Sequence, residues 1–304
     1  MGNEFDSLLK LPLAELIAEA SKIRKKYLGN RFEICSIFNA KSGTCSEDCR
    51  YCAQSAHYST SAPRFPLKEK QEILMAAENA QKNGAERISI VTSGNRLADR
   101  ELIQVAEVCR EIREKVEIGV CASLGAVTKQ ELRILKEAGI TRYHHNIETS
   151  EHFYPQVVST HTFRDRVKTI NAAKEIGLEV CSGGIIGMGE SWQDRIDMAL
   201  KLRELNVDSV PINILIAIKG TPLEKIDTIS CTDIVRTISV FRMILKDRTI
   251  KIAAGRETIL KDFQALGFMA GANGMLVGGY LTVNGRGMID DSNLIKELRK
   301  MWSE

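Results

Sequence analysis

The sequence predicts one eight-stranded parallel α/β barrel of the (β/α)8 type. Three observations favour this fold: short apolar or β-branched runs alternate with longer amphipathic stretches, eight such units follow one another, and no linker or change in composition divides the 304 residues. Closed barrels of this class reach such a length as a single domain. We therefore expect one domain over 1–304, with an N-terminal helical extension at 1–30 and a C-terminal tail and helix at 283–304.

The expected strands alternate with the expected helices along the chain. Strands are expected at 33–39, 87–91, 117–121, 142–147, 178–186, 209–215, 250–254 and 275–277. Helical spacing of apolar residues predicts helices at 68–83, 100–113, 129–138, 163–176, 192–205 and 231–245. Gly84, Gly139 and Gly177 end three of these helices, where a left-handed C-cap turns the chain back toward the sheet. Functional side chains of such a barrel lie at the carboxyl ends of its strands.

The composition narrows the class of partner. Because the 42 basic and 39 acidic residues are interspersed, the charge pattern indicates neither nucleic-acid nor membrane binding. Lys10, Glu15 and Glu19 interrupt the apolar residues of the N-terminus, unlike a signal peptide, and no window approaches the ~18 apolar residues of a membrane span. We expect a cytosolic protein with a small-molecule partner. Eight cysteines in a reducing compartment indicate metal or redox chemistry and not disulfides.

Three cysteines follow the first expected strand in a C-x3-C-x2-C pattern, as Cys45, Cys49 and Cys52. Thiolates are the usual ligands of iron–sulfur clusters, and three of them leave one iron of a four-iron cluster without a protein ligand. The alternative is a zinc site or three incidental buried cysteines. Zinc usually takes a fourth ligand, and His57, the nearest candidate, lies at a spacing unlike that of a zinc finger. The pattern favours a 4Fe-4S cluster with an open iron.

This motif resembles that of the radical S-adenosylmethionine superfamily, and further segments extend the resemblance to the biotin synthase family over nearly the whole chain. The segments are CSEDCRYCAQS at 45–55, VCASLG at 120–125, YHHNIETS at 143–150, VCSGGIIGMGE at 180–190, VPINILIAIKGTPL at 210–223, AAGRE at 253–257 and GFMAGANGMLVGGYLT at 267–282. The resemblance implies a homodimeric enzyme that binds S-adenosylmethionine at the open iron and cleaves it to a 5′-deoxyadenosyl radical. It also implies insertion of sulfur into dethiobiotin, with electrons from a flavodoxin- or ferredoxin-type donor.

The resemblance also implies which residues contact the cofactor. Asn146, Glu148 and Arg166 match positions that hold it, where an amide, a carboxylate and a guanidinium suit ribose hydroxyls and the methionine carboxylate. Tyr51 and Ile185 would frame the adenine. The glycines at 183–184 and at 187–189 allow close backbone approach, but as a bare pattern they are weak signals for nucleotide binding and equally fit a strand end.

Three residues are implied to face dethiobiotin. Asn213 matches the residue that faces the ureido ring, a group that needs both donors and acceptors, and Asn146 is expected to serve both ligands. His144 stands where the family commonly has asparagine. A neutral imidazole donates or accepts one bond but does not do both as an amide does, so contacts to the substrate are expected to differ. The alternative is a solvated or core histidine.

The family carries an auxiliary iron–sulfur cluster, of the 2Fe-2S type, inside the barrel. It is regarded as the sulfur donor, and its ligands are three cysteines and an arginine. Cys121, Cys181 and Arg256 match three of these positions, but Ser89 stands at the fourth, and serine is a poor replacement for a thiolate. The sequence therefore departs from the family at the auxiliary cluster.

We hypothesise that Cys35 replaces the missing cysteine in an auxiliary cluster that differs from the two-iron form. Each layer inside an eight-stranded barrel is filled from alternate strands, and Cys35, Cys121, Cys181 and Arg256 lie on the first, third, fifth and seventh expected strands. An inward-facing set at 250, 252, 254 and 256 would be compatible with this layer. The alternative is that Cys35 is a small core residue.

The remaining cysteines and histidines are given no functional role. Cys109 falls on an apolar helix face and is expected in the core, and Cys231 is treated as incidental. His152 and His161 are expected at the surface. The run 294–302 is predicted to form an amphipathic helix that caps the barrel or lies at a dimer interface.

Other functions share parts of this pattern. A hydrogenase maturase of the HydE type and methylornithine synthase share the barrel and the three-cysteine loop. Neither is expected to need Cys121, Cys181 and Arg256 together, so those residues discriminate. An iron–sulfur carrier or scaffold is the alternative outside the enzymes, and it would not need a cofactor pocket.

Overall fold

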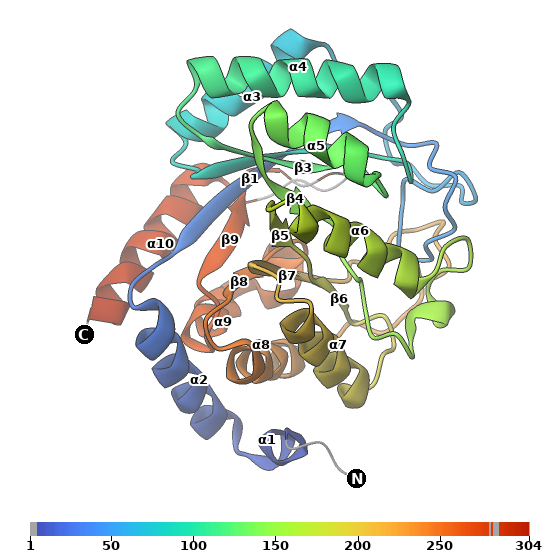
Figure 1. Ribbon diagram of the computed structural model, residues 1–304. Coiled ribbons are helices and arrows are strands. Elements are labelled where there is room, and N and C mark those ends of the chain that lie inside the picture. The colour runs from blue at the N-terminus through green and yellow to red at the C-terminus, as the bar shows by residue number, and fades with distance from the viewer. Residues whose placement is uncertain (1–4, 280, 282–285, 304) are drawn as a thin grey trace.

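A closed parallel barrel surrounded by helices is formed in the computed structural model, which describes residues 5–279, 281 and 286–303 (Figure 1). The strands are β1 (Glu33–Lys41), β2 (Arg87–Thr92), β3 (Gly119–Ser123), β4 (Ile140–His144), β5 (Glu179–Cys181), β6 (Gly184–Ile186), β7 (Ser209–Ile214), β8 (Thr249–Ile252) and β9 (Gly274–Val277). Their order is β5-β4-β3-β2-β1-β9-β8-β7-β6, and β5 also pairs with β7, which closes the sheet. All pairings between these strands are parallel. Since β5 and β6 are two parts of the strand expected at 178–186, the predicted eight-stranded barrel is confirmed.

Two glycines explain the break between β5 and β6. A Cβ atom on Gly183 would lie 2.0 Å from the carbonyl oxygen of Pro211, and one on Gly184 would lie 2.2 Å from that of Glu148. Such distances are far below van der Waals contact, so both positions require glycine for backbone packing. The strand-end interpretation of this pair is therefore the better one.

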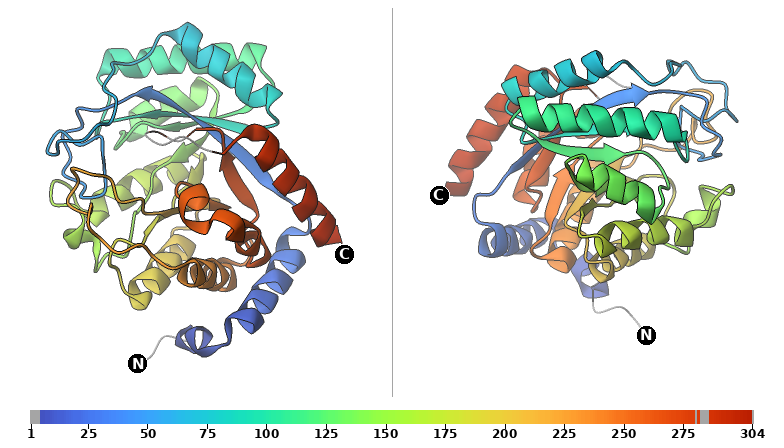
Figure 2. Two further views of the ribbon diagram at one scale, coloured as in Figure 1. Left: turned by 180° about the vertical axis from the view of Figure 1, so that it is seen from behind. Right: turned by 45° about the horizontal axis from the view of Figure 1, so that its top comes forward.

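Helices cover the outside of the barrel (Figure 2). Six follow strands as expected, and their bounds are α3 (Lys70–Lys82), α4 (Asp99–Lys115), α5 (Lys129–Glu137), α6 (Phe163–Glu175), α7 (Trp192–Glu204) and α8 (Cys231–Leu245). Capping boxes begin three of them: the side chains of Thr128, Thr162 and Ser191 each accept a hydrogen bond from the backbone N–H three residues on. Cys109 is fully buried on α4, as expected.

The C-terminal helix packs beside the end of α2, near the amino end of β1 (Figure 1). The N-terminal segment forms α1 (Asp6–Lys10) and α2 (Leu13–Leu28), and the C-terminal segment forms α9 (Gln264–Met269) and α10 (Met288–Ser303), after the short η2 (Arg256–Leu260) and η3 (Lys261–Phe263). Trp302 packs against Phe32, and the Arg24 guanidinium carbon lies 3.7 Å from the centre of the Trp302 ring. The helix expected at 294–302 is thus confirmed, within α10.

None of the helices in the described part of the chain is long and apolar enough to cross a membrane.

Candidate functional site

A cavity of about 300 Å³ gathers most of the residues predicted from the sequence. It lies at the carboxyl ends of the strands and extends into the barrel. Its lining includes Cys45, Cys49, Tyr51, Cys52, His144, Asn146, Glu148, Arg166, Cys181 and Asn213. A more apolar cavity of about 210 Å³ adjoins it, shares Tyr51 and Asn213 with it, and is lined by Ile185. The position agrees with the rule that barrel chemistry occurs at this end of the strands.

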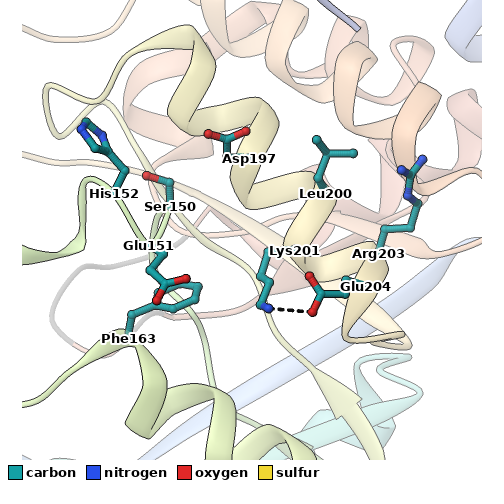
Figure 3. Close-up of a pocket in the computed structure, with 9 residues that line it drawn as sticks. All are labelled: Ser150, Glu151, His152, Phe163, Asp197, Leu200, Lys201, Arg203 and Glu204. Carbon is teal, nitrogen blue, oxygen red and sulfur yellow. Dashed lines mark hydrogen bonds and ion pairs between the residues drawn. The ribbon is translucent and has the colours of Figure 1, made fainter. Parts of the chain in front are cut away.

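A larger hollow of about 960 Å³ lies on the outside of the barrel, beside α6 and α7 (Figure 3). Charged side chains such as Asp197 and Lys201 line it, and Lys201 pairs with Glu204 at 2.7 Å. It contains no residue predicted to bind a cofactor or a substrate. Its size therefore reflects an open groove between helices and does not identify a site.

The three-cysteine loop after β1 is folded by its own backbone. The N–H of Cys45 donates to the carbonyl of Gln54 at 3.0 Å, the N–H of Ala56 donates to that of Cys45 at 2.7 Å, and Cys52 bonds back to Cys49 at 2.9 Å. These bonds fix the backbone of the loop that carries the three thiols. Burial raises the pKa of Cys49 to about 12 and that of Cys52 to about 11, so both are neutral thiols until a metal displaces the proton.

The cysteines of this loop, and those inside the barrel, are not arranged around a single metal ion. No three His, Cys, Asp or Glu side chains of the described residues surround one common ion position. A multi-iron cluster binds each thiolate to a different iron, so its ligands stand further apart than those of one ion. Three thiols on one loop that line a common cavity are a donor set that fits such a cluster.

Glu148 and Asn146 face the same cavity after β4. The backbone of Glu148 is left-handed, with φ of 67°, an uncommon conformation for a side chain of this size that turns the carboxylate inward. One carboxylate oxygen accepts from Asn146 Nδ2 at 3.3 Å, and the other lies 3.6 Å from Arg166 Nη1. Burial raises the pKa of Glu148, although Arg166 and a hydrogen bond from Tyr51 oppose this shift.

Arg166, on α6, is held by three groups from the segment between β4 and α6. Its Nε donates to the Tyr154 hydroxyl at 2.7 Å, and its Nη1 donates to the backbone carbonyl of Asn146 at 3.2 Å. Its Nη2 lies 3.0 Å from His161 Nε2. The prediction that His161 lies at the surface is wrong, because only 10% of its side chain is exposed, whereas His152 is 87% exposed as expected.

Inside the barrel, Cys35, Cys121 and Cys181 are all buried. Lys251 Nζ lies 3.0 Å from Cys35 Sγ and 2.6 Å from Glu33 Oε1, and Arg142 Nη1 also lies 2.6 Å from that oxygen. Burial raises the pKa of Cys35 to about 12. Burial also disfavours the Cys121 thiolate, but a hydrogen bond with His144 and nearby positive charges outweigh it and lower the pKa of Cys121.

The interior fits a sulfur-ligated anionic group. His144 Nε2 lines the cavity and Ser89 Oγ neighbours Cys121 in the strand register, yet both are buried without a hydrogen-bond partner among the described residues. Unpartnered buried polar atoms are rare because each costs free energy. Three thiols with the cations Lys251 and Arg142 close by supply soft ligands and positive charge, which suits an iron–sulfur cluster.

Arg256 is held by groups of the C-terminal part of the chain. Its guanidinium donates to Asp291 Oδ2 at 2.6 Å, to Gln264 Oε1 at 2.5 Å and to the Leu276 carbonyl at 3.1 Å. Those partners direct it toward the C-terminal segment. The expected side-chain alternation on β8 is also reversed, because Lys251 faces Cys35 while the side chain of Ile252 packs toward Gly267 of α9 outside the barrel.

Sequence reasoning thus missed two features of the site: the cations beside the inner cysteines, and His161. A signal for the first was a lysine within an otherwise apolar strand, at Lys251, together with Glu33 at the start of β1. The signal for His161 was its position immediately before the helix that carries Arg166.

Comparison with known proteins agrees with this site. The model of the Radical SAM superfamily matches residues 40–202, and that of the Biotin and Thiamin Synthesis associated domain matches residues 211–299. The fold and the three-cysteine loop therefore define a radical S-adenosylmethionine barrel. The chain belongs to the biotin synthase family.

The relatives that show this family match over nearly their full length. The chain is 50% identical to the biotin synthase of Thermotoga petrophila, over 97% of this chain and 97% of that protein. It is 53% identical to the biotin synthase of Thermotoga neapolitana, over 90% of this chain and 98% of that protein. It is 45% identical to that of Acetivibrio thermocellus, over 95% of this chain and 90% of that protein.

Solved structures of other radical enzymes share the fold. Methylornithine synthase superimposes with a TM-score of 0.84 at 21% identity, over 98% of this chain and 92% of that one. The hydrogenase maturase HydG superimposes with a TM-score of 0.81 at 19% identity, over 97% of this chain and 70% of that one. At such identities the likeness shows the barrel alone. It gives no support to the alternative maturase or methylornithine functions.

Proposed function

We propose that this protein is a biotin synthase that inserts sulfur into dethiobiotin in a radical reaction. The observation that carries the proposal is one continuous site: the three-cysteine loop at the mouth of the cavity and Cys181 with Lys251 deeper in the barrel line the same space. The family membership supports the substrate. When bound, the clusters and S-adenosylmethionine supply electrons, one 5′-deoxyadenosyl radical for each C–H bond broken, and the sulfur atom.

Residues at the mouth would hold the 4Fe-4S cluster and its cofactor. Cys45, Cys49 and Cys52 would ligate the cluster. Arg166 is already oriented by three hydrogen bonds, and a guanidinium fixed in this way is suited to a carboxylate such as that of the methionine part. Glu148 and Asn146 would accept and donate bonds to the ribose hydroxyls, with Tyr51 and Ile185 beside the adenine.

The apolar cavity next to the mouth would hold dethiobiotin. Asn213 is fixed there, because its Oδ1 accepts from the Ala254 N–H and its Nδ2 donates to the Gly184 carbonyl, both at 3.2 Å. An oriented amide suits a ureido ring, which both donates and accepts hydrogen bonds. The aliphatic side chains of Ile214, Ile216 and Ile218 line the remainder and would exclude water from the alkyl chain.

Cys35, Cys121 and Cys181 would ligate the auxiliary cluster. Because Ser89 offers a poor ligand and Arg256 is engaged with Asp291, we propose that this cluster departs from the two-iron form with three cysteines and an arginine. Lys251 and Arg142 would balance its negative charge. His144 hydrogen-bonds Cys121, so we assign it to the surroundings of this cluster and no longer to direct substrate contact.

The proposed setting is a homodimer in the cytosol, reduced by a flavodoxin- or ferredoxin-type protein. All eight cysteines are free thiols, which suits a reducing compartment. The half-buried positions of Cys45 and Cys52 suit electron entry at the mouth.

An anaerobic assay tests the proposal. The reconstituted protein is incubated with dethiobiotin, S-adenosylmethionine and a reductant, and biotin, 5′-deoxyadenosine, iron and sulfide are quantified. We expect both products. Release of 5′-deoxyadenosine without biotin would exclude the proposed substrate. The Cys35→Ala variant should lose the auxiliary iron signal, and an unchanged Mössbauer spectrum would remove Cys35 from the ligand set.

A further inference from the structure

His161 connects the cluster loop to Arg166. One ring nitrogen, Nδ1, lies 2.7 Å from Glu47 Oε2, and the other, Nε2, lies 3.0 Å from Arg166 Nη2. Glu47 stands between Cys45 and Cys49 in the loop that would hold the cluster. The imidazole therefore joins that loop to the guanidinium through two direct contacts.

The chemistry of the two partners fixes the tautomer of His161. A guanidinium only donates hydrogen bonds, so Nε2 must accept one from Arg166. The other nitrogen then carries the proton and donates it to the Glu47 carboxylate. Burial lowers the pKa of His161, and Arg166 lowers it further against the opposing effect of Glu47, which agrees with a neutral ring.

The loop that contains His161 is also bound to the cluster loop by other contacts. Asp48 accepts hydrogen bonds from the backbone N–H groups of Ser159 at 2.9 Å and Thr160 at 3.1 Å. The N–H of Arg50 donates to the Val157 carbonyl at 3.0 Å. The cluster loop and the segment that contains His161 are therefore expected to remain docked without the imidazole. The contact that depends on His161 is the one to Arg166.

We propose that His161 is a positioning residue that sets the orientation of Arg166 relative to the cluster loop, and through it the affinity for S-adenosylmethionine. This inference rests on the proposed function, in which Arg166 binds the methionine carboxylate. That carboxylate would contact the guanidinium while the same methionine part reaches the open iron. A fixed connection between Arg166 and the cluster loop favours one binding geometry for the cofactor. Less conformational freedom of the protein is then lost when the cofactor binds.

Three substitutions separate this role from general support of the loop. His161→Gln offers one acceptor and one donor and can bond both partners. His161→Asn is shorter, so its amide can reach Glu47 but not Arg166. His161→Leu bonds neither. His152→Leu is the matched control, since His152 lies nearby in the chain but its side chain is exposed.

The measurements are iron content, equilibrium binding of S-adenosylmethionine, and the change that the cofactor produces in the electron paramagnetic resonance spectrum of the reduced cluster. We expect iron content to stay at the wild-type level in all variants. Affinity should fall by about tenfold in His161→Asn and His161→Leu, as for a lost hydrogen bond to a charged group, with an altered spectrum. His161→Gln should stay within about threefold of wild type and His152→Leu within about twofold.

The outcomes separate the two proposals. If the wild-type protein binds no S-adenosylmethionine, the proposed function fails. If the wild type binds it and His161→Asn binds it equally well with an unchanged spectrum, the role of His161 is overturned. Loss of iron from both His161→Gln and His161→Asn would also overturn it, since the residue would then support the cluster loop itself.

Discussion

The mouth and the floor of the barrel hold their cysteines in opposite ways. At the mouth, Cys45 and Cys52 are half-buried on a loop fixed by backbone hydrogen bonds. At the floor, by which we mean Cys35, Cys121 and Cys181 with Glu33, Arg142 and Lys251, every side chain is 2% exposed or less. The mouth is therefore organised by one local loop, and the floor by strands far apart in the sequence.

The difference fits the roles that we propose for the two regions. A cofactor that is consumed must enter and leave, so its site needs an opening and adaptable loops. A cluster that supplies sulfur must be protected from solvent, and burial provides this protection. Burial of the cations Lys251 and Arg142 is tolerated because Glu33 contacts both at 2.6 Å. Glu33 is thus the carboxylate that the two buried cations of the floor share, and Glu179 also pairs with Arg142 at 2.9 Å.

The largest expected effect is at the mouth. Cys49→Ala removes one of the three proposed cluster ligands, and we expect complete loss of 5′-deoxyadenosine and of biotin, because no radical forms without the cluster. The measurement is product quantification after anaerobic reconstitution. Cys109→Ala is the control, since Cys109 is a buried cysteine on α4 outside the barrel and should retain both products. Residual 5′-deoxyadenosine in Cys49→Ala would show that the loop is not the radical centre.

The second largest expected effect is a loss of biotin formation alone, after a substitution at the floor. In Cys121→Ala we expect biotin to fall by about a hundredfold while 5′-deoxyadenosine stays within about threefold, since a separate site makes the radical. Both products are quantified in one reaction mixture. A parallel loss of the two products would contradict the division between mouth and floor.

The same comparison explains what the sequence could predict. The loop of Cys45, Cys49 and Cys52 is recognisable because its cysteines are close in sequence. The strands were found for the same reason, since each is a short continuous segment between turns or helices. The orientation of β8 was not predictable: a parallel strand is buried on both faces, so the apolar pattern around Lys251 does not reveal which face is inward. Burial of Lys251 depends on Glu33, a partner more than two hundred residues away.

His161 was mispredicted for a related reason. A polar residue in a loop is usually exposed, and its sequence neighbours give no sign of burial. It is buried because Asp48, on a loop more than a hundred residues earlier, docks the segment at 159–160. Only the folded chain brings Glu47 and Arg166 to its two sides.

The third prediction concerns the stability of the floor. Glu33→Gln leaves Lys251 and Arg142 without their shared anion, and we expect the free energy of unfolding to fall by about 3 kcal/mol, as for a broken buried ion pair. Denaturant unfolding at pH 7 measures this. Glu19→Gln is the control, because the Glu19–Lys22 pair is exposed and should contribute less than about 0.5 kcal/mol.

The pH dependence of that difference is a further check. Burial disfavours the Glu33 carboxylate, but Lys251 and Arg142 outweigh burial and hold its pKa well below 4.5 in the folded state. The stability it contributes is therefore fully present above the unfolded pKa and is lost as the pH falls toward the folded one. The wild type and Glu33→Gln should differ most at pH 7 and converge below about pH 4.5. A constant difference across this range would contradict the ion-pair origin.

The smallest expected effect is a difference in rate. When an iron chelator is added anaerobically to protein that holds both clusters, we expect the mouth to lose iron about fivefold faster or more, because its loop opens without disturbing the barrel whereas the floor needs strands to separate. Mössbauer spectra recorded over time follow the two clusters separately. Added S-adenosylmethionine should slow the loss at the mouth, where it covers the open iron, and leave the floor unchanged. Loss from the floor at an equal or faster rate would mean that burial of Cys35, Cys121 and Cys181 does not protect that cluster, and the contrast between the two regions would then lie in ligand chemistry alone.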